Sequence, residues 1–422
     1  MGREPGTFSR RPLLLPHQNV INQFTRLASS HADVGYFGNV RVGDRGPISL
    51  ADLRKLYHGV VLACGAESDR RLGVPGEDLP NVLSAREFVW WYTGHPGGRA
   101  PPPLAQVRSA AVLGLGNVAL DCARVLLRRP EELQSTDVAA RALEQLRGSA
   151  LESVHVLARR GPPHAACTAK ELREILGLAG VGCRVGAPAD WQLAEAEREA
   201  LGKSRAKKRV FEILEKAREK QHVDEHRTLH MHFNRRPVSI AAAQDAAPHT
   251  LNVELHSTFD PPRPDAPPIT LPVQLVIKAI GYRGVPVDGA PFDPNTGTVP
   301  NARGMVLQAP GSEAFEPGLF VAGWLKRGPS GIIGTNVADA EETVASIGAV
   351  QDDLPRPTES LPGREGLQAL LASRGVPFLT FDHWLALDAA ERALGSKSGK
   401  DREKIVDLEE AVAIALGKTR QD

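Results

Sequence analysis

The strongest constraint on the fold of this chain is a glycine-rich turn between two apolar segments. Residues 109–113 (S-A-A-V-L) are predicted to form a buried strand, and residues 118–127 have helical spacing. The connection reads G-L-G-N-V-A, residues 114–119. Gly114 permits the tight turn, Gly116 lets the backbone approach a pyrophosphate, and Ala119 lets the helix pack on its strand. Strand, turn and helix together are typical of a dinucleotide-binding α/β domain, in which the helix N-terminus faces the phosphates.

The next predicted strand, 153–158 (S-V-H-V-L-A), ends in Arg159 and Arg160. An acidic residue usually stands here to hold a ribose 2′-hydroxyl, whereas two guanidinium groups suit a 2′-phosphate. Alone, the glycines also fit an ordinary strand–helix turn, and the arginines a solvated strand end. Their order within one βαβ unit favours an NADP(H) site. Residues 129–152, a charged segment predicted to be helical, are inserted between the two motifs.

The composition bounds the class of protein. A chain of 422 residues is long enough for two or three domains. Lysine and arginine number 51 and aspartate and glutamate 50, so no overall basic charge indicates nucleic acid. The four cysteines lack C-x-x-C and metal-binding spacing, which favours a reducing compartment, and we expect Cys64 and Cys122 to be small buried hydrophobic residues. No apolar run reaches the roughly 18 residues of a membrane-spanning helix.

Periodicity and capping residues predict the other elements. The predicted helices are 19–31, 50–56 capped by Ser49, one starting at Ser84, 168–176 capped by Thr168, 190–221 and 337–349. The predicted strands are 36–43, a buried one at 57–66, 273–282 and 317–324, and a β meander is expected over 228–240 and 250–258. Residues 1–16 are Arg-rich but broken by proline, at most a partial transit sequence.

Several motifs together resemble one family. These are G-L-G-N-V-A-L-D, A-R-R-G-P, T-A-K-E-L-R-E, V-I-K-A-I-G-Y and, most specifically, A-G-W-L-K-R-G-P-S-G-I-I-G-T-N. The chain resembles the adrenodoxin reductase-like ferredoxin–NADP reductases, from about Asn19 to Asn336 and weakly through the tail. This resemblance implies an α/β fold with two Rossmann-like three-layer dinucleotide-binding domains and a small helical C-terminal region.

The implied domains are an FAD-binding domain in two segments, 1–103 and 285–352, an NADP-binding domain at 104–284 and a C-terminal extension at 353–422. The family begins with an apolar strand and a G-x-G-x-x-G turn for the FAD pyrophosphate, and no such turn occurs before residue 104. We therefore expect the first domain to be truncated at its N-terminus. Two further departures are Leu115, where the family usually has a polar residue, and Pro163-His164, which follow the arginines.

The resemblance also implies site residues. Those expected to bind NADP are Leu115, Gly116, Asn117, Val118, Arg159, Arg160, Glu171 and Gly331. Those expected along FAD are Val42, Trp324, Gly331, Ile332 and Ile333. Trp324 by itself would also fit a core aromatic residue, but its place between a strand and a glycine turn favours the cofactor.

The implied activity is an NADPH:ferredoxin oxidoreductase, in which a hydride passes from NADPH to FAD and single electrons then pass to a [2Fe–2S] ferredoxin. No acid–base residue is required for this chemistry. Ferredoxins are acidic, so we expect the partner at Lys207, Lys208 and Arg209, although a solvated helix face would have a similar pattern.

Two other functions compete with this one. A subunit resembling the small subunit of glutamate synthase would carry cysteine clusters, which this chain lacks. A truncated, non-catalytic protein that binds NADP(H) or ferredoxin without flavin is the alternative from another class.

Four histidines have the spacing of metal ligands. His222 and His226 are four residues apart and His230 and His232 two apart, but no cysteine or carboxylate completes a shell. We expect structural histidines and no metal. The expected location is the mitochondrial matrix side, or the cytoplasm if the protein is bacterial, with no nucleic acid partner and at most peripheral membrane association.

Overall fold

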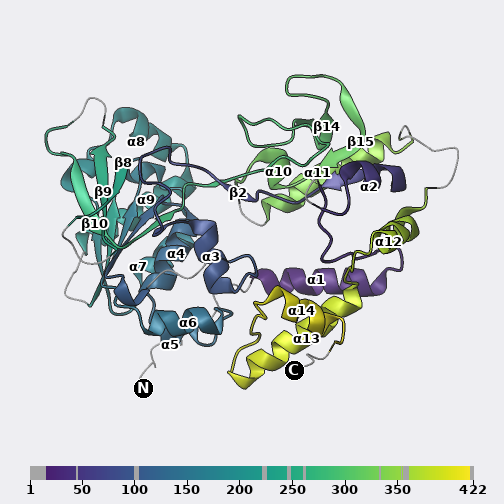
Figure 1. Cartoon of the computed structure of the whole chain (residues 1–422). Coiled ribbons are helices and arrows are strands. Elements are labelled where there is room, and N and C mark those ends of the chain that lie inside the picture. The colour runs from purple at the N-terminus through teal and green to yellow at the C-terminus, as the bar shows by residue number, and fades with distance from the viewer. Residues whose placement is uncertain are drawn as a thin grey trace, which may run out of the picture. The chain divides into compact units, whose positions relative to one another are not determined.

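The structure, a computed structural model, describes residues 16–43, 46–98, 104–220, 226–244, 249–259, 263–331, 334–352, 354 and 361–418 (Figure 1). The chain forms two compact units. The first is built from Arg71–Ile280 and Ala390–Ala411, and the second mainly from His17–Arg70 and Gly281–Ala389. The partial transit sequence expected at 1–16 lies almost entirely outside the described residues.

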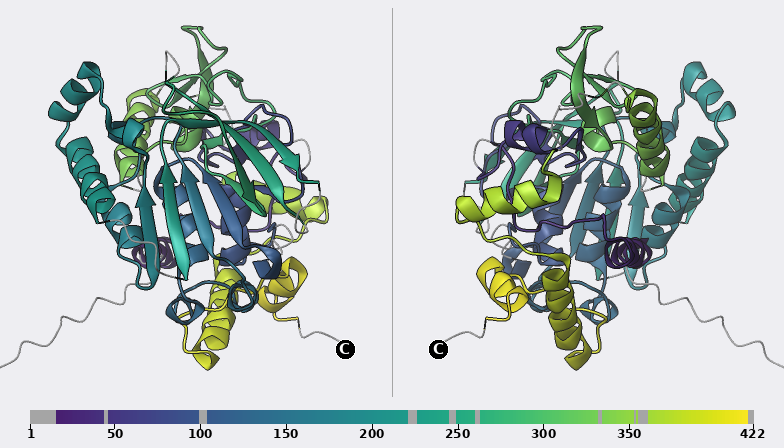
Figure 2. Two further views of the ribbon diagram at one scale, coloured as in Figure 1. Left: turned by 90° about the vertical axis from the view of Figure 1, so that its left-hand side faces the viewer. Right: turned by 90° about the vertical axis from the view of Figure 1, so that its right-hand side faces the viewer.

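A six-stranded sheet forms the centre of the first unit, and every neighbouring pair in it is parallel. Its order is β3 (Val82–Ser84), β11 (Leu275–Lys278), β4 (Ser109–Leu113), β5 (Ser153–Leu157), β7 (Arg227–His232) and β6 (Val181–Val185). Figure 2 shows these strands running alongside one another. The strand order reverses at β4, because β4 lies between β5, the strand that follows it in the sequence, and β11, the last strand of this sheet in the sequence. Such a switch point is where open α/β sheets bind ligands, beyond the carboxyl ends of the strands.

The two faces of this sheet are covered differently. One face packs against helices, and side chains such as Val112, Val154 and Met231 lie in that core. The helices are α3 (Ala85–Thr93), α4 (Asn117–Leu127), α6 (Ala140–Arg147), α7 (Ala169–Leu176) and α9 (Arg205–Glu219). On the other face, Ala111 and Leu113 share a core with Val253 of an antiparallel sheet. That sheet consists of β10 (Ile269–Val273), β9 (Leu251–Ser257) and β8 (Arg235–Ala242), so the unit has three layers.

The second unit contains a smaller sheet. Its order is β1 (Val60–Leu62), β15 (Phe315–Val321), β14 (Met305–Leu307) and β13 (Asn301–Ala302), and only the β1–β15 pair is parallel among the described residues. Helix α11 (Thr335–Val350) contacts β14 and β15. The remaining elements are α1 (Pro16–Ser30), α2 (Leu50–Leu56), α10 (Trp324–Arg327), α12 (Gly363–Ser373) and the ribbon of β2 (Ser68–Asp69) with β12 (Tyr282–Arg283).

Part of the C-terminal tail belongs to the first unit. The tail carries α13 (Phe381–Lys397) and α14 (Leu408–Ala415), which agrees with the helical region predicted there. The buried ammonium group of Lys400 donates to the carbonyl oxygen of Val138 at 2.8 Å. The Glu403 carboxylate accepts the backbone N–H of Ala140 at 2.7 Å, which caps the first turn of α6. These contacts fasten Ala390–Ala411 to the first unit.

The three helix starts predicted from capping residues are confirmed, whereas the helices predicted at 19–31 and 337–349 begin a few residues earlier, at Pro16 and Thr335. Ser49 and Ser84 form capping boxes with Asp52 and Glu87, and Thr168 accepts the N–H of Glu171. The insertion 129–152 is helical as expected, in α5 (Pro130–Leu133) and α6. The expected helix at 190–221 is instead two, α8 (Glu195–Gly202) and α9, because Ser204 leaves the helical conformation and caps α9.

Several strand predictions are wrong in extent or pairing. Residues 36–43 form no strand, only isolated bridges at Gly38 and Val42. The strand expected at 57–66 is limited to β1, in which Val61 is 45% exposed, and Cys64 is exposed because it lies beyond the strand end. Cys122 is buried as expected.

The expected β meander is divided between two sheets, and the strand predicted at 273–282 among three, because Val273 ends β10, residues 275–278 form β11 and Tyr282 begins β12. Only β8, β9 and β10 form the antiparallel sheet, and β7 joins the parallel one. The side chain of Gln274 marks where the chain changes sheets, because its oxygen accepts the backbone N–H groups of Arg108 and Ser109. In the described part of the chain, no helix combines the length and apolar character needed to cross a membrane.

Candidate functional site

The turn between β4 and α4 has the geometry of a phosphate-binding turn. Gly114 adopts φ +125°, and a Cβ there would collide with the carbonyl oxygen of Ala279, so only glycine fits. Gly116 is the N-cap of α4 and provides no side chain to cap it. A Cβ at Gly116 would meet no atom within 4 Å. The first N–H groups of α4 therefore face open space at the switch point of the sheet, where an anion is stabilised.

Two residues of this turn also fasten it to the next helix. The carbonyl oxygen of Leu115 accepts the N–H of Ala166 at 3.0 Å, and the Asn117 side-chain oxygen accepts the N–H of Thr168 at 2.8 Å. The Leu115 side chain is buried, and Val118 packs at the edge of the helical core. The structural use of Asn117 was not predicted, because its partner is 51 residues away in the sequence.

Arg159 and Arg160 lie at the carboxyl end of β5, the strand beside β4. Both are exposed, and within the described ranges neither guanidinium group makes a hydrogen bond or an ion pair. The Arg159 backbone is fixed, since its carbonyl oxygen accepts the hydroxyl of Thr258 at 2.7 Å. Two unpaired guanidinium groups beside the open turn fit the 2′-phosphate and pyrophosphate of NADP(H).

Glu171, a predicted nucleotide contact, lies in a charged cluster between α4 and α7. Its carboxylate is 3.0 Å from Arg124, which is buried and also pairs with Asp121 and Glu174. Burial raises the pKa of Asp121 to about 6, with a further contribution from the charges of Glu171 and Glu174 and against the opposing effect of Arg124. The cluster joins α7 to α4, and contact of Glu171 with nucleotide stays a prediction.

The second unit presents an open edge where its two parallel strands end. Gly65 follows β1 and Gly323 follows β15, both with positive φ, and a Cβ at either would meet nothing within 4 Å. Trp324 comes next and stacks on Tyr282, with ring centroids 5.6 Å apart and planes inclined by 24°. An open, glycine-lined edge beside a stacked aromatic pair fits the planar ring of a flavin. Val42, the other predicted FAD contact here, is exposed beside Ile48.

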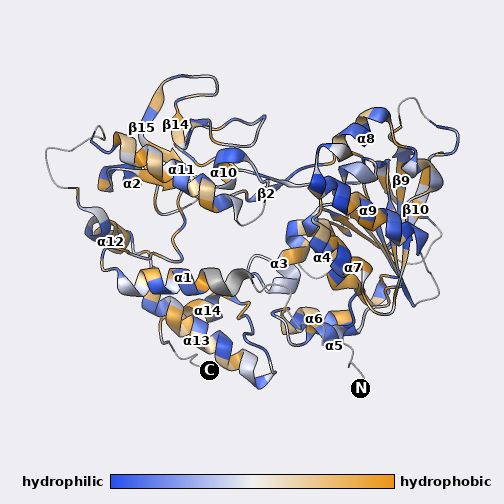
Figure 3. Ribbon diagram, turned by 180° about the vertical axis from the view of Figure 1, so that it is seen from behind, coloured by the Kyte–Doolittle hydropathy of each residue, from blue (hydrophilic) through white to orange (hydrophobic). Residues whose placement is uncertain are grey.

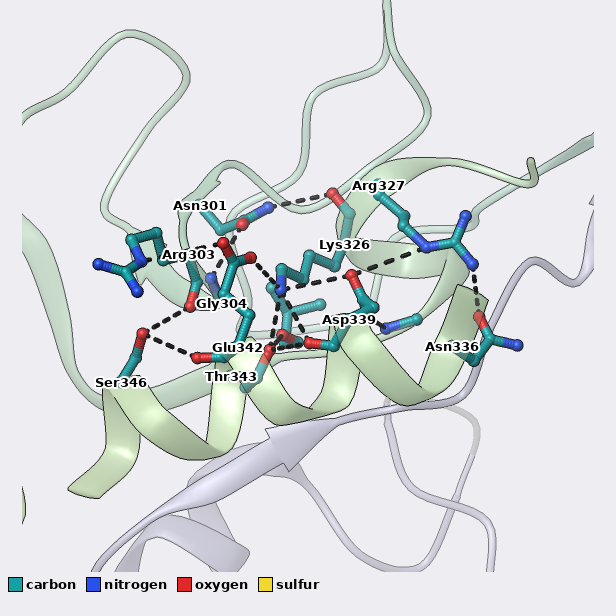
Figure 4. A network of polar contacts seen from close by, with 12 residues as sticks. Asn301, Arg303, Gly304, Lys326, Arg327, Asn336, Asp339, Glu342, Thr343 and Ser346 are labelled. Carbon is teal, nitrogen blue, oxygen red and sulfur yellow. Dashed lines mark hydrogen bonds and ion pairs between the residues drawn. The ribbon is translucent and has the colours of Figure 1, made fainter. Parts of the chain in front are cut away.

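The Lys-Arg pair after Trp324 holds this edge together (Figure 4). The Lys326 ammonium group is buried and contacts Glu342 at 2.7 Å, Thr343 at 3.1 Å and the Asp339 carboxylate at 3.3 Å. Asp339 in turn accepts the N–H of Gly323 at 2.5 Å. Lys326 thereby ties α10 to α11 and fixes the glycine at the end of β15.

Arg327 fastens the loop that follows. Its guanidinium group donates to Thr335 at 3.1 Å and to Asn336 and Ser330. Gly331 adopts φ +83°, and a Cβ there would collide with the Thr335 hydroxyl. Ile332 and Ile333, both predicted to lie along FAD, fall outside the described residues. The motif predicted a cofactor site, but not the structural use of its two cations.

A hollow of about 530 Å³ lies beside α9, and we call it the basic hollow. It is lined by Arg173, Arg205, Lys208, Arg209, Glu212, Ile213 and Lys216. Of the three predicted partner-binding residues, Lys208 and Arg209 line it and Lys207 does not. Arg173, which was not predicted, comes from α7. Figure 3 shows the hydrophilic residues of α9 beside its apolar turns.

Two of the four spaced histidines form a cluster with a third. His155 on β5 stacks on His230 at 4.5 Å, and its Nδ1 lies 3.1 Å from Nε2 of His232. Burial lowers the pKa of His155 to about 3 and that of His232 to about 4. His222 is outside the described residues. In the part of the chain that the structure covers, no group of histidine, cysteine or acidic residues could hold a metal ion.

Comparison with known proteins gives consistent relatives. No protein-family model matches the chain. Over 412 residues it is 44% identical to "NADPH:adrenodoxin oxidoreductase, mitochondrial" of Arabidopsis thaliana, covering 94% of this chain and 84% of the relative. Over 391 residues it is 37% identical to NADPH-ferredoxin reductase FprA of Mycobacterium tuberculosis, covering 90% and 83%.

A solved structure extends this likeness to the fold. Mycobacterium tuberculosis FprA in complex with NADPH matches with a TM-score of 0.83 and 34% identity, covering 95% of this chain and 87% of that one. The predicted α/β class with two dinucleotide-binding domains is thus confirmed, as is the family that the motifs resemble. The chain belongs to the family of NADPH:adrenodoxin oxidoreductases and NADPH-ferredoxin reductases.

Proposed function

We propose that this chain is an FAD-dependent NADPH:ferredoxin oxidoreductase. One observation carries the NADPH half: the uncapped N-terminus of α4 opens beside two arginines whose guanidinium groups pair with no described residue. Free N–H groups at a helix start, with positive charge beside them at the switch point of a parallel sheet, support this assignment. The relatives, which are named for NADPH and for adrenodoxin or ferredoxin, support the same assignment.

The residues of the second unit suit FAD. Trp324 and Gly331 would lie along the flavin ring, with Ile332 and Ile333 following, and the backbone at Val42 would meet the adenine. FAD, when bound, accepts a hydride from NADPH and delivers the electrons singly to an iron–sulfur protein. The chain's own task is to hold the two cofactors in position and exclude water. Lys326 supports that task, because it ties α10 to Asp339, whose carboxylate accepts the N–H of Gly323.

On the first unit, the backbone of the glycine turn would contact NADP, at Leu115, Gly116, Asn117 and Val118. Arg159 and Arg160 would hold the 2′-phosphate, with Glu171 nearby. The N–H groups at the start of α4 would orient the pyrophosphate. No side chain needs to act as a nucleophile or a general acid, since the cofactors carry the electrons.

The partner that fits the basic hollow is an acidic [2Fe–2S] ferredoxin. Five of the seven lining side chains are cationic and one is anionic, on a chain whose net charge is only +1. A local positive surface of this kind steers an acidic protein and orients it on arrival. The names of the relatives support an adrenodoxin or ferredoxin as the acceptor.

The proposed location is the mitochondrial matrix. The relatives from plants and animals are named as mitochondrial, whereas FprA is bacterial. Fractionation of cells of the source organism with an antibody against the chain would separate the two locations.

Titration of the purified 422-residue chain with FAD tests the cofactor assignment. The expected result is a yellow protein that binds one flavin per chain. Its flavin absorbance, at about 450 nm, should be bleached by NADPH in the absence of oxygen. A protein that binds NADPH but stays colourless with FAD in excess would instead be the non-catalytic alternative.

A further inference from the structure

We propose that His164 and Glu197 are positioning residues for the 2′-phosphate end of the nucleotide site. The proposal rests on the NADPH function proposed above. It concerns the short loop that begins with Arg159 and Arg160, passes Gly161 and ends in the 3-10 turn Pro162–His164. His164 is also one of the positions at which this chain departs from the family's pattern.

The imidazole of His164 fastens the end of this loop to α8. Its Nε2 lies 3.3 Å from a carboxylate oxygen of Glu197, in the first turn of α8. With its proton on Nε2, the imidazole donates to that oxygen. The backbone N–H of His164 donates to the carbonyl oxygen of Gly161 at 3.0 Å, so the imidazole and the residue after the arginines belong to one turn.

The Glu197 carboxylate is itself held in place. Its second oxygen accepts the N–H of Ala194 at 2.9 Å, which caps α8. A Cβ at Gly161 would lie 3.5 Å from the oxygen that faces His164. The carboxylate is thus fixed directly over the residue that follows Arg160.

The rest of the loop is held through its backbone. The Thr258 hydroxyl donates to the carbonyl oxygen of Arg159 at 2.7 Å, and the N–H of Asn234 donates to the carbonyl oxygen of Arg160 at 3.4 Å. The two guanidinium groups have no partner among the described residues, so the position of the backbone that carries them decides which space they can reach. The His164–Glu197 pair sets where that backbone turns.

The hydrogen bond from His164 also holds one oxygen of the Glu197 carboxylate beside Gly161. Without that donor, the oxygen is free to turn towards a bound anion, which the carboxylate would repel. Loss of His164 should therefore weaken binding of a 2′-phosphate more than loss of both residues together. This order of effects distinguishes a hydrogen-bonded positioning pair from a simple packing contact.

Calorimetric titration of the full chain with 2′,5′-ADP and with 5′-ADP, which lacks the 2′-phosphate, tests the proposal. His164→Leu should weaken 2′,5′-ADP binding by about three- to tenfold and leave 5′-ADP binding unchanged, as expected for the loss of one ordinary hydrogen bond. The double variant His164→Leu with Glu197→Gln should recover part of the loss. His164→Gln, which keeps an N–H donor, should recover most of it.

Glu199→Gln is the matched control, since Glu199 lies on the same helix and pairs with Lys203 at 3.4 Å. It should bind both ligands like the unmodified chain. Equal 2′,5′-ADP binding by His164→Leu and the unmodified chain would overturn the proposal, as would equal weakening of both ligands. An unmodified chain that does not prefer 2′,5′-ADP over 5′-ADP would instead contradict the NADPH function itself.

Discussion

At the scale of single residues, Arg159 and Arg160 are expected to decide which nucleotide the chain prefers. Replacing either by alanine removes a charge-assisted contact worth about 1.5–3 kcal/mol, so affinity for 2′,5′-ADP should fall about 10- to 100-fold. Affinity for 5′-ADP should change little. Arg108→Ala is the control, because Arg108 is exposed at the opposite end of the same sheet, next to Glu152. Equal loss of both ligands in the Arg159 and Arg160 variants would contradict the assignment.

Lys326 is expected to contribute strongly to the stability of the second unit. The Lys326 side chain is 5% exposed and its ammonium group faces the Asp339 carboxylate, whose side chain is also buried. Lys326→Met removes the nearer of the two cations beside that carboxylate and leaves Arg327 at 3.7 Å, so the free energy of unfolding should fall by about 3 kcal/mol. Chemical denaturation of the apoprotein measures it. Arg303→Ala, which removes an exposed cation 3.8 Å from Glu342, should cost under about 1 kcal/mol, and an equal loss would refute the structural role.

Single residues were predicted as far as local pattern could reach. The glycines at 114 and 116 and the two arginines are recognisable because turn, strand end and helix start are adjacent in the sequence. Asn117 acts through Thr168, which is 51 residues away in the sequence. Lys326 acts through α11, with partners from Asp339 to Thr343 that are 13 to 17 residues away. Sequence spacing alone does not show which backbone N–H or carboxylate a side chain will meet.

At the scale of elements, α9 is expected to present one face to the partner. Lys208 lines the basic hollow and Lys207 does not, although both are exposed lysines. Lys208→Glu should raise the KM for ferredoxin about tenfold at low ionic strength, and the effect should shrink with added salt. Lys207→Glu makes the same change of charge and should have a clearly smaller effect. Identical KM values for the two variants would remove the basic hollow as the docking surface.

Strands β5 and β7 carry a pH dependence through their histidines. In the unfolded chain these imidazoles bind protons near pH 6.5, whereas burial lowers the pKa of His155 to about 3 and of His232 to about 4. Between these values the unfolded state binds more protons, so the free energy of unfolding falls as the pH drops from about 6.5 towards 4. Above pH 6.5 the contribution is constant.

His155→Phe should flatten this part of the stability profile, because the ring still stacks but no longer titrates. Urea unfolding at pH 7, 5.5 and 4.5 measures the slope. His31→Phe replaces an exposed histidine and serves as the control. An unchanged slope in His155→Phe would show that the cluster is not the source.

Helices were predicted more accurately than strands, for a physical reason. A capping serine or threonine acts within its own turn, so Ser49, Ser84 and Thr168 are visible in the sequence. A strand is defined by its neighbours. Val60 to Leu62 resemble a buried strand, yet Val61 is exposed whereas Leu62 is buried, because successive side chains point to opposite faces of the sheet and only one of these faces is covered at β1.

At the scale of the whole molecule, distant segments complete each unit. Strand β11 closes the parallel sheet beside β4, more than 160 residues after it, and this creates the switch point at the glycine turn. Residues 390–411 join the first unit, where Lys400 and Glu403 reach the start of α6. Contacts between segments so far apart in the sequence become visible only in the folded structure, whereas the family could be predicted from short motifs alone.

The central claim is that the chain transfers electrons from NADPH to a ferredoxin. The most direct measurement is steady-state reduction of a [2Fe–2S] ferredoxin by the FAD-loaded chain, with NADPH and NADH compared in parallel. We predict ferredoxin reduction with a kcat/KM for NADPH at least about 100-fold above that for NADH, from two charge-assisted contacts. A chain that holds FAD but reduces ferredoxin with neither nucleotide, or equally well with both, would contradict the account.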